Sequence, residues 1–316
     1  MSRYLVTGGA GFIGSHLVRA LLGRGDDVVV LDDFSTGRRE NLAEVVGQIT
    51  LVEGSLNDEA ALNRALEGVV GVLHQAAMPS VPKSVAHPRP THQANVEGTL
   101  RLLDACRRLG VRRVVYAASS SAYGDQEAPR KSEGLTPRPL SPYAVQKLTG
   151  EYYCQVFSRL YGLEAIGLRY FNVFGPRQDP KSQYAAVIPA FVTRLLAGQR
   201  PVIYGDGGQS RDFTFVQNVV EANLAALAAP IDATGEIYNA ACGEQTTLLE
   251  LHRLIAERLG VSLAPEHAPP RVGDVRASCA DPRRALAALG WQARISVREG
   301  LNETVDWYRK GFIPSV

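Results

Sequence analysis

Residues 4–14 read Tyr-Leu-Val-Thr-Gly-Gly-Ala-Gly-Phe-Ile-Gly, a short apolar stretch that runs into a glycine-rich turn. Apolar residues then recur at helical spacing as far as Gly23, which predicts the end of a helix. Residues 28–31 form a second apolar stretch, and Asp32 follows it directly. This order of strand, glycine turn, helix, strand and terminal acid is the one that a dinucleotide-binding site requires.

Each glycine of the turn has a physical role. Gly8 permits the tight turn, Gly11 lets the backbone approach a pyrophosphate, and Gly14 lets the helix pack closely on the strand. The N-terminus of the helix adds amide donors and positive potential. Asp32 can accept a hydrogen bond from a ribose 2′-hydroxyl, and its charge would repel a 2′-phosphate. The sequence therefore predicts NAD as the cofactor.

Arg38 and Arg39 offer an alternative, because guanidinium groups can receive the 2′-phosphate of NADP. Both arginines lie beyond the end of the strand, so NAD remains the favoured cofactor.

Strands and helices continue to alternate along the first half of the chain. The expected strands are residues 48–54, 71–77, 113–119 and 164–171, and the expected helices are residues 59–66, about 91–109 and about 142–161. Such alternation predicts a doubly wound parallel sheet with helices on both faces. Ligands bind beyond the carboxyl ends of the strands in these sheets. The segments that fall there are residues 8–14, 76–85, 119–121 and 171–172.

The rhythm changes after Gly175. Helices are expected at residues 184–197, 216–228, 247–259 and 296–308, with a short strand at 201–204, a turn at 205–208 and a strand near 237–239. We expect residues 1–175, with a return near 213–242, to form a Rossmann-type α/β domain that binds the cofactor. Residues 176–316 would form a smaller mixed α/β region that binds the substrate.

The composition is that of an ordinary globular protein, with 316 residues, 45% hydrophobic and 21% charged. A net charge of +2 supports neither a nucleic-acid footprint nor a membrane-surface one. The four cysteines are scattered, which suits a reducing compartment, and the six histidines show no metal-ligand spacing. No apolar run reaches membrane-spanning length, and the strand at Tyr4 leaves no room for a signal peptide. We therefore expect a cytoplasmic protein with no metal, nucleic acid or membrane partner.

Tyr143 and Lys147 are four residues apart in a predicted helix that starts at Ser141 and Pro142. The ammonium and the phenol then lie on one helix face. A phenol titrates near pH ~10 in water, and a neighbouring cation favours the phenolate. A tyrosine made acidic in this way can serve as a general acid or base near neutral pH. The pair alone is a weak indication, because this spacing occurs by chance in many helices.

Four motifs occur in order along the chain: residues 8–14, Ser119-Ser120-Ser121-Ala122-Tyr123-Gly124, Tyr143 with Lys147, and Arg169-Tyr170-Phe171-Asn172. Together they resemble the extended short-chain dehydrogenase/reductase family of nucleotide-sugar epimerases and dehydratases. The resemblance runs nearly end to end. Within the family, residues 172–189 (NVFGPRQDPKSQYAAVIP) and 204–213 are most similar to the branch of UDP-N-acetylglucosamine and UDP-glucose 4-epimerases.

The resemblance implies an NAD-dependent UDP-sugar 4-epimerase that inverts C4 through a transient 4-keto sugar. Its catalytic residues would be Ser119, Tyr143 and Lys147. The tyrosine would take the proton of the sugar 4-hydroxyl, the serine would bridge the two, and the lysine would hold the nicotinamide ribose and lower the pKa of Tyr143. The family's dehydratases carry an Asp-Glu pair where this chain has Ser120 and Ser121, and related decarboxylases carry a Glu at the second position. Epimerisation needs neither carboxylate.

The resemblance also implies the binding residues. Those for NAD would be Gly8, Gly11, Phe12, Ile13, Gly14, Asp32, Asp33, Ser35, Thr36, Gly37, Leu56, Ala76, Ala77, Asn95, Tyr143, Lys147, Tyr170 and Val173. Those for the UDP-sugar would be Ser80, Ser84, Ser119, Ser120, Ser121, Tyr143, Asn172, Ala186, Val187, Tyr204, Arg211, Arg271, Asp274 and Ser278. Tyr204 would lie near the uracil, the two arginines would meet the diphosphate, and Asp274 would accept from the uridine ribose.

Two departures from the family pattern bear on the substrate and the cofactor. Ser278 stands where a bulky tyrosine in some 4-epimerases excludes an N-acetyl group. The small side chain leaves room, so we expect activity on UDP-GlcNAc and UDP-GalNAc, alongside UDP-Glc and UDP-Gal. Ser55 stands where the family usually has an Asp near the adenine amino group, and this change would weaken NAD retention.

Two other functions stay open. A UDP-glucuronate 4-epimerase would share the catalytic residues and would use Lys83 or Arg177 to receive the C5 carboxylate. A catalytically inactive, dinucleotide-sensing regulatory protein belongs to a different class, but such relatives usually lose the tyrosine or the lysine.

The resemblance further implies a homodimer, because in the family the helices at 91–109 and 143–161 form a four-helix seam. The apolar residues that would build it are Val96, Leu100, Leu103, Val156, Phe157 and Leu160. The alternative is that these residues pack on their own sheet.

Overall fold

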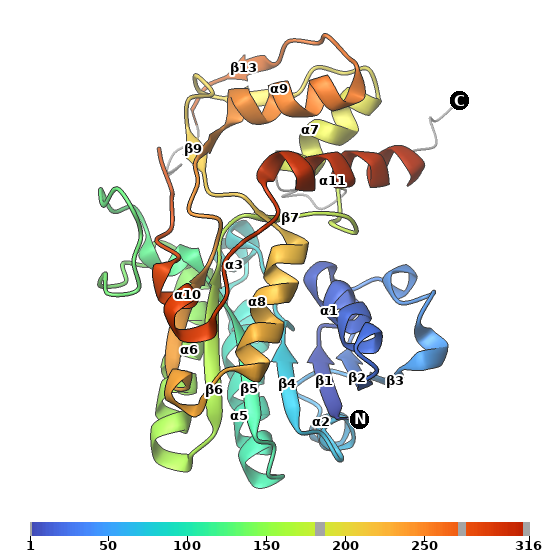
Figure 1. The fold of residues 1–316 in the computed structure, drawn as a ribbon, viewed down its shortest axis with the longest axis vertical. Coiled ribbons are helices and arrows are strands. Elements are labelled where there is room, and N and C mark those ends of the chain that lie inside the picture. Colours follow the sequence, from blue (N-terminus) through green and yellow to red (C-terminus); the bar gives the residue numbers. More distant parts are fainter. Residues whose placement is uncertain (1, 181–186, 271–275, 312–316) are drawn as a thin grey trace.

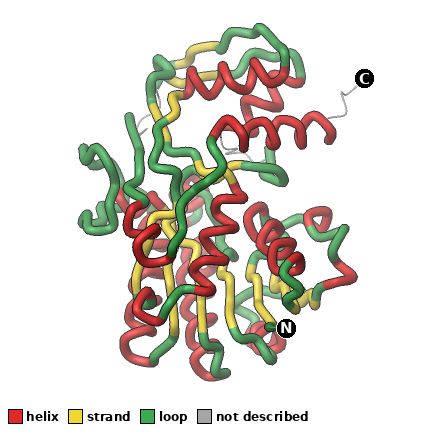
Figure 2. Tube along the Cα trace, viewed as in Figure 1, coloured by secondary structure: helices red, strands yellow, loops and turns green. Residues whose placement is uncertain are grey.

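The computed structural model describes residues 2–180, 187–270 and 276–311, and at its centre lies a seven-stranded parallel sheet (Figure 1, Figure 2). The strands are β1 (Arg3–Thr7), β2 (Asp27–Asp32), β3 (Thr50–Glu53), β4 (Gly71–His74), β5 (Arg113–Ser119), β6 (Glu164–Tyr170) and β11 (Glu236–Ala240). Their spatial order is β11-β6-β5-β4-β1-β2-β3, with every neighbouring pair parallel. The strand order reverses between β1 and β4, which is where such sheets bind ligands. The predicted doubly wound α/β fold is confirmed.

Helices cover both faces of the sheet and bury its apolar side chains. One face carries α2 (Glu59–Leu66), α5 (Gly98–Arg108) and α6 (Pro142–Tyr161), and the other carries α1 (Phe12–Gly23), α8 (Val216–Ala228) and α10 (Arg283–Leu289). Successive side chains of β1 point to opposite faces of the sheet. Leu5 packs in the core beneath α2, α5 and α6, and Val6 packs in the core beneath α1 and α8. Strands covered on both faces have a continuous apolar run, as residues 28–31 of β2 and 72–73 of β4 show.

The helix α6 begins and ends at residues suited to those positions. The Ser141 side chain accepts a hydrogen bond from Ala144 N at 3.1 Å, and Pro142 occupies the first turn. The helix ends at Gly162, which adopts the left-handed conformation with φ 70°. This start places Tyr143 at the carboxyl end of β5, next to the sheet.

A second region lies beyond the carboxyl ends of the strands (Figure 1). Its core is formed by α7 (Val187–Leu196), α9 (Leu248–Leu259) and α11 (Val297–Gly311), which pack together on residues such as Phe191, Ile255 and Val305. Three two-stranded pairs accompany them: β7 (Val173–Phe174) with β10 (Thr214–Phe215), β9 (Ser210–Arg211) with β12 (Thr246–Thr247), and β8 (Val202–Tyr204) with β13 (Glu266–Ala268). After β10 the chain forms α8, which packs on the central sheet, and then β11, which pairs with β6.

The structure differs from the sequence-based expectations mainly around residues 75–98. The helix expected from about residue 91 is preceded by α3 (Val81–Ala86) and α4 (Pro88–His92), neither of which was predicted. It then contains a π-helical turn, Gln93–Glu97, before α5. The strand β4 also ends three residues earlier than expected, at His74, and α10 was missed. Within the described ranges, short 3₁₀ turns lie at Arg39–Asn41, Val46–Gln48, Ser120–Tyr123 and Ile231–Ala233. Among the described residues, no helix combines the length and hydropathy needed to span a bilayer.

Gly150 allows α6 to lie directly on β5, and its replacement tests this close approach. A Cβ at Gly150 would lie 2.3 Å from Tyr116 Oη, and Tyr116 is only 1% exposed. Because Tyr116 cannot move aside, Gly150→Ala should lower the free energy of unfolding by about 1–3 kcal/mol in urea titrations. Gly23→Ala, at the end of α1 with no neighbouring atom within 4 Å of the added carbon, is the matched control. It should be neutral or stabilising, and equal losses in both variants would contradict the packing argument.

Candidate active site

A cavity of about 920 Å³ opens at the carboxyl ends of the central strands. This volume is at the upper end of the range of about 300–1,000 Å³ for small-molecule sites. The predicted cofactor residues that line it are Gly8, Gly11, Phe12, Ile13, Gly14, Asp32, Asp33, Ser35, Thr36, Gly37, Leu56, Ala76, Ala77, Tyr143, Lys147, Tyr170 and Val173. The predicted substrate residues that line it are Ser80, Ser119, Tyr143 and Asn172. Residues from widely separated parts of the chain therefore meet in one place.

The glycine turn at the start of α1 fits a dinucleotide. Gly8 adopts φ 67°, and a Cβ on it would lie 2.7 Å from Ala76 N. A Cβ on Gly14 would lie 2.1 Å from Gly8 O, so only glycine lets the helix come this close to the strand. Gly11 caps α1 without a side-chain hydrogen bond, so no side chain of the cap competes with an anionic group for the first-turn amides.

Asp32 lies at the end of β2, where a ribose would be recognised. It is 7% exposed, and its two oxygens accept from Ala10 N at 2.9 Å and from Phe34 N at 2.8 Å. Burial raises the pKa of Asp32, while these two hydrogen bonds act in the opposite direction. Phe34 takes a positive φ of 55° to donate its amide, so the backbone is bent to hold the carboxylate in place.

Lys147 is fixed by a single described hydrogen bond deep in the site. Its Nζ donates to Ala117 O at 2.9 Å and lies 5.0 Å from the centre of the Tyr116 ring. The residue is 4% exposed, and burial lowers the pKa of Lys147 to about 8, with the Glu151 carboxylate acting in the opposite direction. Glu151 itself is held by Arg169 through two buried hydrogen bonds of 2.9 and 2.7 Å.

Tyr143 and Ser119 both line the cavity, and the Ser119 side chain lies near enough to the phenol to act on its pKa. The prediction that the pKa of Tyr143 is lowered is wrong for this structure. Burial raises this pKa, and the hydrogen bond from Ser119 opposes the rise only in part. The Lys147 ammonium is directed at Ala117 O, so it does not outweigh the burial of the phenol.

The serine run organises the Ser119 hydroxyl. Ser119 Oγ accepts from Ser121 N at 3.2 Å and from Ser121 Oγ at 2.8 Å. With both acceptor positions of a hydroxyl used, its proton is available to Tyr143 or to a bound molecule. Ser120 and Ser121 do not line the cavity, so Ser121 acts by positioning Ser119.

Two predicted binding residues, Ser84 and Asn95, are buried beneath the cavity lining and hydrogen-bond to the segments that form it. Ser84 is fully buried, and its Oγ accepts from Tyr143 N at 3.0 Å, which fixes the first turn of α6. Asn95 is 1% exposed and accepts from Met78 N at 2.7 Å while donating to Gln146 at 2.8 Å. Neither side chain lines the cavity.

The remaining predicted substrate residues belong to the second region. Val187, Tyr204, Arg211 and Ser278 do not line the cavity among its described residues. Ser278 is half-buried beside β9, where its amide donates to Ser210 O at 3.2 Å. Ala186, Arg271 and Asp274 lie outside the described residues.

Sequence reasoning missed several residues of the cavity. Asp179 lines it and forms an ion pair of 2.7 Å with Arg38, a cavity residue expected from the sequence only as a partner for the 2′-phosphate of NADP. Gln75 lines it as well and donates to Tyr170 Oη at 3.1 Å. Its position directly after β4 was the only signal in the sequence that could have identified it.

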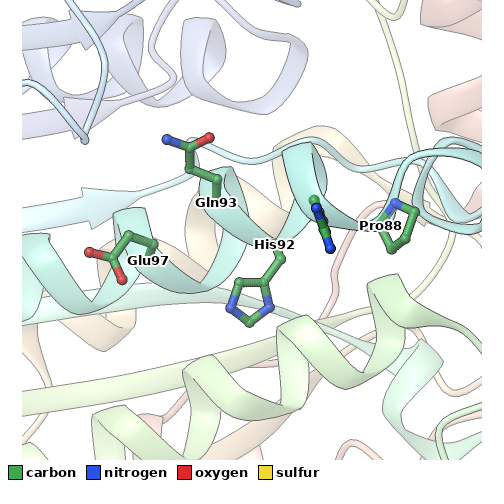
Figure 3. A pocket seen from close by; sticks show the side chains of 5 residues that line it. Pro88, His92, Gln93 and Glu97 are labelled. Carbon is green, nitrogen blue, oxygen red and sulfur yellow. The ribbon is translucent and has the colours of Figure 1, made fainter.

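A second hollow lies along α4 and the π-helical turn and is shown in Figure 3. Pro88, Arg89, His92, Gln93 and Glu97 line it, and none of them belongs to the predicted sites. Among the described residues, no cluster of His, Cys, Asp and Glu is suited to hold a metal ion.

The comparisons with known proteins agree with this geometry. A model of the NAD dependent epimerase/dehydratase family matches residues 4–241. A UDP-glucose 4-epimerase of Mycolicibacterium smegmatis is 42% identical over 311 residues, which cover 97% of this chain and 98% of the relative.

Two solved structures superpose over nearly the whole chain. The UDP-N-acetylglucosamine 4-epimerase from Methanobrevibacter ruminantium, in complex with UDP-N-acetylmuramic acid, is similar with a TM-score of 0.94 and 38% identity over 98% of this chain and 99% of that one. The UDP-glucose 4-epimerase of Thermus thermophilus in complex with NAD gives a TM-score of 0.89 and 41% identity over 98% and 100%.

Burial of the Lys147 ammonium should be visible in the pH dependence of stability. Below pH 8 this lysine is protonated in both the folded and the unfolded chain. Between pH 8 and about 10.4, the ordinary value for lysine, the folded protein has released the proton that the unfolded chain still binds. The free energy of unfolding of the wild type, relative to Lys147→Met, should therefore rise across this interval in urea titrations at pH 7, 9 and 10.

Lys310→Met, which removes an exposed lysine of α11, controls for the loss of any lysine charge. A difference between wild type and Lys147→Met that stays constant from pH 7 to 10 would contradict the burial of this ammonium.

Proposed function

The chain belongs to the NAD-dependent epimerase/dehydratase family, and on this premise we propose that it is a UDP-sugar 4-epimerase that inverts C4 through a transient 4-keto sugar. It is an NAD-dependent enzyme. The observation that carries the proposal is the meeting of Ser119, Tyr143 and Lys147 with the glycine turn in one cavity.

Each of the three residues has a defined task in this proposal. NAD held at the glycine turn and Asp32 supplies the acceptor and later the donor of hydride. Tyr143 takes the proton of the sugar 4-hydroxyl while C4 is oxidised and returns it when C4 is reduced on the opposite face. Ser119, with its proton free to donate, bridges the sugar hydroxyl and the phenol. Lys147 lies one helical turn after Tyr143 in α6, and its positive charge can hold a ribose hydroxyl there.

The absence of carboxylates supports epimerisation over neighbouring chemistries. Ser120 and Ser121 occupy the positions where dehydratases and decarboxylases of the family would carry acids. Ser121 uses both its amide and its hydroxyl on Ser119, so it offers no acid or base to a substrate.

We further propose UDP-GlcNAc and UDP-GalNAc as the preferred pair, with UDP-Glc and UDP-Gal as additional substrates. The nucleotide would be bound by Asn172, Tyr204 and Arg211. Ala186, Arg271 and Asp274, which lie outside the described ranges, would bind it as well. The small Ser278 would admit the N-acetyl group.

A UDP-glucuronate 4-epimerase is the second candidate. One observation favours it: the exposed Lys83 lines the cavity beside Ser80 and could receive a C5 carboxylate. Arg177 lines the cavity too. Its guanidinium lies 3.6 Å from the Glu44 carboxylate, so part of its charge is already paired.

The division of labour within the chain is also a proposal. We assign cofactor binding to residues 1–175 with the return near 213–242, and substrate binding to residues 176–316. The pairing of β11 with β6 and the packing of α8 on the sheet support this return. We propose a cytoplasmic location for the enzyme.

Incubation of the purified protein with UDP-Glc, UDP-GlcNAc and UDP-GlcA, separately and without added NADH, tests the function. Formation of the 4-epimer, detected by chromatography, is expected, and the ratio of rates identifies the substrate. Tyr143→Phe should reduce turnover at least about 10²–10⁴-fold, because the proton acceptor is lost while the ring and its packing remain. Protein that retains NAD yet turns over none of the three sugars would refute the proposal and favour a dinucleotide-sensing role.

The size of residue 278 should set the tolerance for the N-acetyl group. Ser278→Tyr is expected to reduce turnover of UDP-GlcNAc at least about tenfold and to spare UDP-Glc, because a bulky ring occupies the space of the acetamide. Ser278→Ala, which keeps the space, is the matched control and should retain both activities. If Ser278→Tyr turns over UDP-GlcNAc as fast as wild type does, then residue 278 does not determine the specificity for the N-acetyl group.

We propose a homodimer as well. Of the apolar residues suggested for its seam, Val96, Leu103 and Phe157 are buried in this chain, whereas Val156 and Leu160 of α6 are 45% and 65% exposed. With Tyr152 they form an exposed apolar row at a spacing of four residues.

Light scattering should give about twice the chain mass of 34.2 kDa. Leu160→Glu should shift the mass toward the monomer, while Val46→Glu, at a 51% exposed valine between β2 and β3, should leave it unchanged. A wild-type monomer would contradict the proposal.

A further inference from the structure

Asp212 forms a joint between three segments that are distant in the sequence. The residue is fully buried between β9 and β10. Its Oδ1 accepts from Cys242 N at 3.1 Å, and its Oδ2 accepts from Gly243 N at 2.9 Å and from Ala280 N at 3.0 Å. Its backbone carbonyl accepts from Asn172 Nδ2 at 3.0 Å.

These segments carry the residues proposed to bind the UDP-sugar. Asn172 lines the cavity and holds a positive φ of 34°, and Arg211 directly precedes Asp212. The extended segment 276–281 contains Ser278, two residues before the bonded Ala280. Figure 1 shows β9 beside the helices of the second region, beyond the carboxyl ends of the sheet strands.

We infer that Asp212 is a positioning residue for the substrate. Its carboxylate ties residues 242–243 and segment 276–281 to the chain that follows Arg211, and its backbone carbonyl accepts from Asn172, so that these parts form one wall of the UDP-sugar site. The inference rests on the proposed function, since it concerns the binding of that nucleotide-sugar. Asp212 itself lies outside the lining of the cavity, so it acts through the residues it holds.

The joint requires a carboxylate. Three amide N–H groups point at its two oxygens, and a carboxylate can accept all three. An amide of the same shape has one oxygen, so in either orientation its NH₂ group would face at least one backbone donor. Such an opposed pair loses the hydrogen bond and leaves a buried donor without an acceptor.

The carboxylate is held at a cost to stability. Burial raises the pKa of Asp212 to about 6, while its three backbone hydrogen bonds act in the opposite direction. The titratable groups that face it are the Glu244 carboxylate and the thiols of Cys242 and Cys279, and Arg130 lies near Cys279. Burial raises the pKa of both thiols, so they stay neutral where Asp212 titrates. A buried carboxylate such as that of Asp212 lowers stability, and residues that do so are expected at functional positions.

The test compares Asp212→Asn with wild type, both as purified with their NAD. We expect the Kd for UDP and the KM for the UDP-sugar to rise at least tenfold in the variant, with kcat changed less than threefold and NAD content unchanged. Asp206→Asn is the matched control, because Asp206 is an exposed carboxylate that pairs with Arg276 at the start of the same segment, at 2.7 Å. It should change neither constant more than twofold.

A second measurement uses the pH and does not depend on a variant that folds well. As the pH falls through about 6, Asp212 takes up a proton, and one of its oxygens becomes a hydroxyl donor facing amide donors. The KM of the wild type for the UDP-sugar should therefore rise below this pH, although the diphosphate diester does not titrate there. NAD content should stay constant, the Asp206→Asn variant should show the same profile, and Asp212→Asn should lack the step.

The outcomes separate this inference from the proposed function. Unchanged Kd and KM in Asp212→Asn, or a KM of wild type that does not change through pH 6, would overturn the role of Asp212. Parallel loss of NAD and UDP binding would also overturn it, because that result indicates general loosening. If wild type binds UDP and the variant does not, while no UDP-sugar is turned over, then the epimerase proposal alone fails. A wild type that binds no UDP would overturn both.

Discussion

The buried ammonium of Lys147 sets the relation between the helix and the sheet on which the candidate site is built. It donates to Ala117 O at the end of β5, and Gly150 removes the side chain that would hold the helix away. Ser119 follows Ala117 by two residues, and Tyr143 precedes Lys147 by one helical turn. One hydrogen bond thus brings the serine and the tyrosine to face each other. Any other register of helix and strand would separate them.

The two halves of the cavity are supported by different means. The cofactor side depends on backbone shape, with glycines at positions where any Cβ would collide and Asp32 held by two amides. The proposed substrate side depends on side chains that bridge segments: Ser84 Oγ accepts from Tyr143 N, and Asn172 Nδ2 donates to the backbone carbonyl of Asp212. Backbone shape is rigid because it is part of the sheet, whereas bridges of single side chains can be changed one at a time. On the proposed assignment, substitutions on the substrate side would change the choice of sugar without disturbing the cofactor side.

The sequence was sufficient where structure follows from local pattern. The glycine turn, the apolar strands and the start of α6 at Ser141 have local causes, and all of them are found in the structure. Reasoning failed where the partner lies far along the chain. Nothing near Ser84 indicates that its hydroxyl accepts from Tyr143 N, and nothing near Arg38 indicates its ion pair with Asp179. The expected lowering of the Tyr143 pKa failed for another reason, because spacing in a helix gives proximity but not the extent of burial.

The ion pair of Arg38 and Asp179 has a kinetic consequence. It links the loop after β2 to the segment after β7, and both side chains line the cavity. The two side chains are 46% and 36% exposed, and pairs of this kind contribute only about 0–1 kcal/mol. Such a contact opens and recloses rapidly at thermal energies, so it can slow the escape of a bound molecule only slightly. If the glycine turn and Asp32 bind the dinucleotide as proposed, its residence should depend on them more than on this exposed pair, and it should depend little on ionic strength.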